Sequence, residues 1–256
     1  MSLSCLKSKT GDKPVIYLFP PKSSEEMDVA VDLALVPQWK FFAIYPVIPT
    51  KSQAPSGHGE NLTWSVHINE DQTLTEKTTG LTVSYLYWEA ETQAVLPTPP
   101  GSPVPGDEMV QHFDPITSDV SDDDGVSVLL PLAELTPYLD AALKSLGLHT
   151  EARTSFITYW LPSFNKHTYI ALRFVPQAAY ARAASLNHFF MLFRGVEEPD
   201  LWLNAIARVP ESLEKWKDVI GCGPADVLAD DDLFRVLEWG GMEVKKWHTI
   251  QDTHTD

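Results

Sequence analysis

The sequence has few cysteines, few basic residues and no long hydrophobic run. Its two cysteines, Cys5 and Cys222, are too few for a disulfide framework or a thiolate-rich zinc site, so a reducing compartment is expected. The apolar segment Phe41–Ile48 contains Pro46 and is far shorter than the roughly 20 residues of a membrane-spanning helix. The first dozen residues lack the apolar stretch of a secretory signal. We therefore expect a cytoplasmic protein that has no membrane partner.

Basic residues are outnumbered by acidic ones, and this limits the classes of partner. The 256-residue chain has 19 Lys and Arg against 35 Asp and Glu, a net charge of −16, which repels nucleic-acid phosphates. The same charge favours a polar uncharged or cationic ligand. The motifs of P-loop, dinucleotide-binding, serine-hydrolase and HExxH zinc proteins are also missing. We therefore predict no nucleic-acid partner, no cofactor and no metal site, and the sequence leaves the oligomeric state open.

The composition and the hydrophobic periodicity divide the chain into segments. Hydrophobic residues make up 44% of the chain, which is enough for a folded core. Apolar residues alternate with polar ones in the first half, as at Leu62, Trp64, Val66 and Ile68. The sequence predicts an α+β fold in which a β-rich half, an antiparallel sheet or a sandwich, packs with a mixed α/β half as one compact unit. The predicted boundaries are a tail over 1–12, the β-rich half over 13–95, a loose Pro- and Asp-rich insertion over 96–126, the mixed half over 127–250 and a tail over 251–256.

In the second half, prolines and glycines predict where helices and turns lie. Proline is favoured in the first turn of a helix, and a proline after a helical segment marks its end. Helices are therefore expected over 136–146, from Thr150 to Pro162, over 199–207 and over 210–220. Strands are expected over 168–175 and 188–193. Gly240 and Gly241 predict a tight hairpin between two further strands, because glycine tolerates a positive φ.

Four sequence blocks carry a resemblance to a known family. They are KPVIYLFP over 13–20, YLYWE over 85–89, FITYWLP over 156–162 and VLEWGG over 236–241. With these blocks the chain resembles an uncharacterised family of bacterial and fungal proteins, in which a tyrosine commonly stands at the position of Phe19. The resemblance spans most of the chain and implies that both halves belong to one unit. It implies no activity, because that family has no established function.

Large aromatic side chains next to polar groups suggest a binding cleft. Rings can stack on apolar ligand surfaces while neighbouring polar groups bind hydroxyl or amide groups, as in sites for sugars and peptides. The alternative is that these rings are core residues, as most aromatic residues in sheets are. The candidate ligand-binding residues are Trp88, Tyr159, Trp160, Tyr169, Arg173 and Trp239.

Titratable residues around the predicted helix at 150–162 suggest acid–base chemistry. A histidine and a carboxylate can act as base and acid, while an arginine holds an anionic group. The alternative for Glu151 is a helix-dipole contact in the first turn. The candidate catalytic residues are His149, Glu151, Arg153, His167 and Glu89.

Two functions therefore stay open. The favoured one is a non-enzymatic binding or interaction protein with an aromatic-lined cleft, which takes a small polar or cationic ligand, a sugar or a peptide. The other is a cofactor-independent hydrolase or lyase. A pocket that holds two of the candidate groups within hydrogen-bond reach of one point would favour the enzyme, whereas exposed and dispersed groups would disfavour it.

Overall fold

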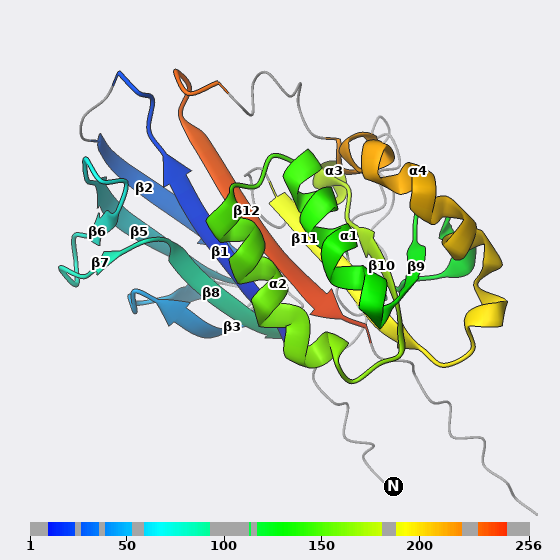
Figure 1. Ribbon diagram of the computed structural model, residues 1–256. Helices are drawn as coiled ribbons and strands as arrows, with labels where there is room; N and C mark the ends of the chain where they lie inside the picture. The colour runs from blue at the N-terminus through cyan, green and yellow to red at the C-terminus, as the bar shows by residue number, and fades with distance from the viewer. Residues whose placement is uncertain are drawn as a thin grey trace, which may run out of the picture.

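The fold is α+β, as predicted, and has three layers (Figure 1). The computed structural model describes residues 10–23, 27–35, 39–52, 59–92, 113, 117–180, 188–221 and 230–244. A large sheet lies in the middle, with helices on one face and a smaller sheet on the other. Both cysteines and the predicted tail at 251–256 lie outside the described residues.

The large sheet has seven strands in the order β3-β8-β1-β12-β11-β10-β9, with β1 and β12 near its centre. Its neighbouring strands are antiparallel except for β11 and β12, which run parallel. Strand β1 begins within the predicted tail. The strands are β1 (Thr10–Phe19), β3 (Trp39–Tyr45), β8 (Leu86–Thr92), β9 (Val128–Pro131), β10 (Tyr169–Phe174), β11 (His188–Val196) and β12 (Arg235–Glu243).

The small sheet is formed by the first half of the chain alone. Strand β2 pairs with β5 over its full length, and the antiparallel register places Leu33 opposite Leu62 and Val31 opposite Trp64. The inward-facing residues of β5 are the four that alternate in the sequence, so the prediction of this strand is confirmed. The strands are β2 (Met27–Ala34), β4 (Lys51–Ser52), β5 (Glu60–Ile68), β6 (Leu74–Glu76) and β7 (Thr82–Val83).

The helices pack mainly against the large sheet on the face opposite the small sheet. Their amphipathic faces contribute Leu139, Trp160 and Trp216 to the core on that side. The helices are α1 (Leu132–Ser145), α2 (Thr150–Phe164), the short α3 (Gln177–Tyr180) and α4 (Leu203–Ile220), with single 3-10 turns at Asp122–Asp124 and Pro199–Leu201. Within the described part of the chain, no helix is long and apolar enough to cross a membrane.

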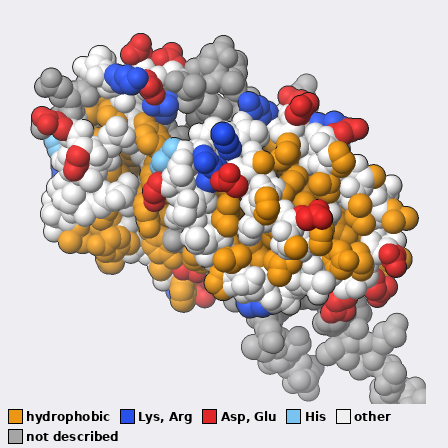
Figure 2. Space-filling model, in the orientation of Figure 1, with side chains coloured by type: hydrophobic (Ala, Val, Ile, Leu, Met, Phe, Trp, Pro, Cys, Tyr) orange, Lys and Arg blue, Asp and Glu red, His pale blue; other side chains and the backbone are white. Residues whose placement is uncertain are grey.

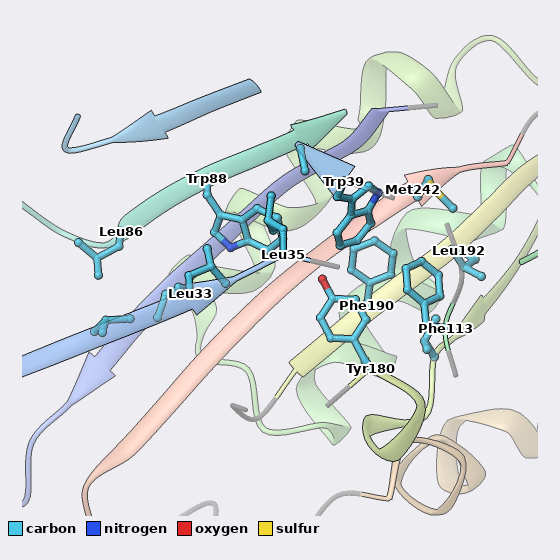
Figure 3. Close-up of a cluster of buried hydrophobic side chains, with 14 of the residues drawn as sticks. Leu33, Leu35, Trp39, Leu86, Trp88, Phe113, Tyr180, Phe190, Leu192 and Met242 are labelled. Atoms are coloured by element: carbon cyan, nitrogen blue, oxygen red, sulfur yellow. The ribbon is translucent and has the colours of Figure 1, made fainter. Parts of the chain in front are cut away.

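The large sheet is covered on both faces, and its strands therefore feed two separate cores. In β1, Val15 and Tyr17 point to the helices, whereas Ile16 and Leu18 point to the small sheet, as the period of two in a strand requires. The core between the sheets is rich in large side chains that come from both of them (Figure 3). The residues labelled there are Leu33, Leu35, Trp39, Leu86, Trp88, Phe113, Tyr180, Phe190, Leu192 and Met242.

Three prolines that were expected to begin or end helices lie inside them. Pro137 is in α1, Pro162 is in α2, and Pro210 joins the two helices predicted at 199–207 and 210–220 into the single helix α4, preceded by a 3-10 turn. Each proline removes the N–H that would bond the carbonyl four residues earlier. The residues at those positions, 133, 158 and 206, are all exposed, so water can hydrate the carbonyls that lack a helical partner.

The hairpin predicted at Gly240 and Gly241 was wrong. Strand β12 runs through both glycines without a turn and pairs with β11 at these positions. Position 241 needs glycine because the neighbouring atoms are packed closely around it. A Cβ on Gly241 would lie 2.9 Å from the Met191 carbonyl oxygen and 3.0 Å from the Trp160 ring. Gly241 therefore allows α2 to approach the sheet.

The described part of the predicted insertion is packed on the fold, contrary to the expectation of a loose segment. Phe113 is buried among Trp39, Tyr180 and Phe190, and Val120 is fully buried. Asp122 accepts hydrogen bonds from the backbone N–H of Ala205 and the side chain of Asn204, at 2.7 Å each, on helix α4.

Candidate functional site

A pocket of about 390 Å³ lies at the end of the large sheet where β1 ends and β12 begins. Its walls come from five segments: the end of β1, the turn between β5 and β6, the connection between α1 and α2, the start of β11 and the start of β12. All three layers therefore meet there. The lining residues are Phe19, Pro20, Lys22, Gln72, Leu146, Gly147, His149, Phe189, Asp231, Arg235, Val236 and Leu237.

Charged groups of both signs line this pocket. The Asp231 carboxylate accepts a hydrogen bond of 2.7 Å from Nη2 of Arg235, and its other oxygen pairs with Nζ of Lys22 at 2.5 Å. The Lys22 ammonium lowers the pKa of Asp231, and Asp231 raises the pKa of Lys22. Figure 2 shows basic and acidic side chains gathered at the top of the view, where the loop before β12 lies in Figure 1. The pocket thus has two permanent cations and one carboxylate although the whole chain is strongly acidic.

His149 lies at the pocket on the side of the helices. Its ring packs edge-on against Tyr17 and Phe19, with centroid distances of 5.0 and 5.5 Å. Its Nε2 lies 3.2 Å from Oε2 of Glu151. Burial, together with the nearby Glu151 carboxylate, raises the pKa of Tyr17. The structure therefore brings together His149 and Glu151, two of the predicted catalytic residues, at the border of the pocket.

The three predicted tryptophans are buried in the core. Trp88 and Trp160 are 1% exposed and Trp239 is fully buried, so none of them presents a ring face to solvent. Trp88 donates a hydrogen bond of 2.8 Å from Nε1 to Oε1 of the buried Glu238. Trp160 packs on Phe193 and Trp239 on Phe156, in the core on the side of the helices. The aromatic cleft expected at these rings is therefore a packed core, and the pocket is lined by other residues.

The remaining candidate residues are dispersed. Arg153 is paired with Asp140 at 2.8 Å, and Arg173 lies 3.9 Å from Asp124. Half-buried Tyr159 packs on Trp160, and Tyr169 packs against the core between the sheets. Two further hydrogen bonds involve predicted catalytic residues: Glu89 accepts from the Tyr87 hydroxyl at 2.6 Å, and His167 Nε2 lies 3.0 Å from Glu243 Oε1.

His149 and His167 cannot act on the same small ligand. His149 precedes α2 and His167 follows it, and an α-helix of 15 residues is about 22 Å long. The partner of His167, Glu243, ends β12, whereas the pocket lies at the start of that strand. The two histidines are therefore at opposite ends of the large sheet, and only His149 lines the pocket.

Sequence reasoning missed Lys22, Asp231 and Arg235, the charged residues of the pocket. They come from the turn after β1 and from the loop and first residue of β12, about 200 residues apart in the chain, and no spacing motif connects them. The described residues contain no group of three His, Cys, Asp or Glu side chains placed to hold a metal ion. Comparisons with protein-family models, with curated proteins and with solved structures find no match. The resemblance to an uncharacterised family thus stays a prediction.

Proposed function

We propose that this protein binds a small polar ligand, such as a sugar or a short peptide, in the pocket at the end of the large sheet. The observation that carries the proposal is the combination of volume and lining. About 390 Å³ is within the range of small-molecule sites. Apolar side chains such as Phe19 and Leu237 form part of the wall, and polar groups such as Arg235 and Gln72 converge on the same space.

The charges at the pocket disfavour a purely cationic ligand. Lys22 and Arg235 would repel a cation, while Asp231 gives a ligand amine or hydroxyl an acceptor. The proposal thus keeps the ligand class predicted from the sequence, apart from cations, and moves the site from the tryptophans to this pocket.

A ligand panel combined with a pocket-filling variant tests this proposal. Gln72 has an exposed side chain that lines the pocket, so Gln72→Trp should fill the space without disturbing the core. Glu70→Trp places the same ring on an exposed residue of the same turn that does not line the pocket. Monosaccharides, dipeptides and small carboxylates are screened by thermal shift. At least one should raise the Tm of the wild type and of Glu70→Trp but not that of Gln72→Trp. Equal shifts in all three proteins, or no shift with any compound, would contradict the proposal.

A second candidate function is acid–base hydrolysis or elimination with His149 and Glu151. The 3.2 Å contact between these side chains, with His149 on the pocket wall, favours it. Both side chains are substantially exposed, which weakens their effect on each other. Turnover of chromogenic esters or glycosides that His149→Gln and Glu151→Gln each abolish would support this function. Turnover that is unchanged in both variants, or a wild type that turns over none of these substrates, would exclude this function for them.

A further inference from the structure

The pocket already contains a carboxylate bound by two cations. Asp231 uses one oxygen for Arg235 and the other for Lys22, and all three side chains line the pocket. This two-oxygen arrangement is the one that a ligand carboxylate makes with a guanidinium and an ammonium group. Asp231 therefore occupies the position where an external carboxylate would bind.

The Lys22 backbone and the Arg235 guanidinium are held by contacts that do not involve the Asp231 side chain. The backbone N–H of Lys22 donates 2.8 Å to the backbone carbonyl of Asp231, which joins the two loops through main-chain atoms. The Arg235 guanidinium lies 5.5 Å from the Phe19 ring centroid, and the two residues are opposite each other in the β1–β12 register. The Arg235 guanidinium can therefore keep its position when the Asp231 carboxylate rotates away, and the Lys22 ammonium stays within reach of the same place because its backbone is anchored.

Displacing Asp231 is energetically feasible. Its side chain is 41% exposed and that of Lys22 is 73% exposed. Ion pairs between such exposed groups contribute little to stability, because water screens them. Apart from Gln72 and His149, the remaining side chains of the pocket wall are apolar, with Leu146, Phe189 and Val236 in addition to Phe19, so the ligand needs an apolar group beside the carboxylate.

We propose that the ligand of this pocket is a small molecule with a carboxylate and a short apolar group, and that its carboxylate displaces Asp231 from Lys22 and Arg235. The inference rests on the proposed function and specifies its ligand class. A phosphate is less suitable, because the observed occupant of the cation pair is planar and singly charged, whereas a phosphate is tetrahedral and carries more charge.

Hexanoate is the probe, and its binding is measured by NMR titration and calorimetry. Hexanamide has the same chain without charge, hexylamine has the opposite charge, and inorganic phosphate is an anion without an apolar part. We expect hexanoate to bind most tightly, with shifts at the amides of Lys22, Asp231 and Arg235. Tighter binding of hexanamide or hexylamine at the same amides would overturn the carboxylate class and leave the proposed pocket function intact. Tighter binding of phosphate would also overturn it.

Variants of the charged cluster separate displacement from simple attraction. Asp231→Asn removes the internal competitor and should tighten hexanoate binding about threefold or more. Arg235→Gln should weaken it about tenfold or more, and Arg235→Lys, which keeps the charge, should weaken it less. Glu211→Gln and Lys215→Gln make the same charge changes in an exposed ion pair on α4 and serve as controls.

Weaker hexanoate binding to Asp231→Asn than to the wild type would overturn the displacement. Equal effects of Arg235→Gln and Lys215→Gln would show attraction by net charge alone and would overturn the assignment of the cation pair. Absence of hexanoate binding would overturn the inference, whereas the sugar and dipeptide arms of the thermal-shift panel would still decide the proposed function.

Discussion

At the scale of single residues, the most unusual group is the buried carboxylate of Glu238. It is 2% exposed and lies in the aromatic core, where Trp88 donates to its Oε1. Burial, with a contribution from Glu238, raises the pKa of Tyr180. A buried carboxylate is stable only when hydrogen bonds replace its hydration, so the Trp88 donor matters more than an ordinary neutral bond.

Replacing Trp88 with phenylalanine tests the importance of this donor. Trp64→Phe is the matched control, because Trp64 is also fully buried and donates from Nε1 to a neutral acceptor, the Pro46 carbonyl, at 2.9 Å. Both variants lose the same atoms. We expect Trp88→Phe to lower the free energy of unfolding by about 1–2 kcal/mol more than Trp64→Phe, because bonds to charged groups are stronger. Urea denaturation measures both, and equal losses would contradict the role given to Glu238.

A second residue-scale prediction concerns Glu76, a fully buried carboxylate in the small sheet. Burial raises its pKa, but hydrogen bonds from the backbone N–H groups of Thr78 and Thr79, at 3.1 and 2.7 Å, and from the side chains of the same residues together lower it by more, so the net shift is downward from 4.5. Because the pKa of Glu76 is lower in the folded state than in the unfolded state, its ionised carboxylate stabilises the fold at pH values above the unfolded-state pKa. This stabilisation is lost as the pH falls through the folded-state pKa.

The Glu76→Gln variant should therefore show a pH-dependent loss. We expect the free energy of unfolding to fall by about 1–3 kcal/mol at pH 7, because a charged acceptor of two backbone N–H groups is replaced by a neutral one. The difference from wild type should shrink as pH falls below about 4. Glu70→Gln, at an exposed carboxylate in the same hairpin, should change stability little. A loss independent of pH in Glu76→Gln would contradict the assigned cause.

At the scale of elements, the contact between α2 and β12 fixes the helix layer on the large sheet. Trp160 on α2 lies over Gly241 on β12, where any side chain would collide with its ring. The sequence could not indicate this, because two adjacent glycines are typical both of a hairpin turn and of a strand that passes under a large ring. In contrast, β5 was predicted well, since one of its faces is buried and its alternation is regular.

The Gly241→Ala variant tests this contact. The added methyl group would lie 3.0 Å from the Trp160 ring, so we expect a loss of about 1–3 kcal/mol from overpacking. Trp160→Phe removes the ring atoms in question, and the double variant should lose less stability than the two single variants together. Thermal and urea unfolding measure the free energies of unfolding of the wild type, the two single variants and the double variant. Strict additivity would show that the helix and strand do not meet in this way.

At the scale of the whole molecule, one end of the large sheet is where the three layers leave space. The sequence predicted the fold class and several strands, among them β5, β10 and β11, but not the pocket, because its walls come from segments far apart in the chain. It also could not tell core tryptophans from ligand-binding ones, since the same residue type suits both environments. The local excess of cations at the pocket is similarly hidden in a chain whose net charge is −16.

NMR mapping of a bound dipeptide tests most directly whether this pocket is the ligand site. Glycyl-leucine has both a carboxylate and a short apolar group. During its titration, we predict shifts of the backbone amides of Lys22, Asp231 and Arg235, while the indole N–H signals of Trp88 and Trp160 stay unchanged because both rings are buried. Shifts of those indole signals without any change at the three amides would contradict the account.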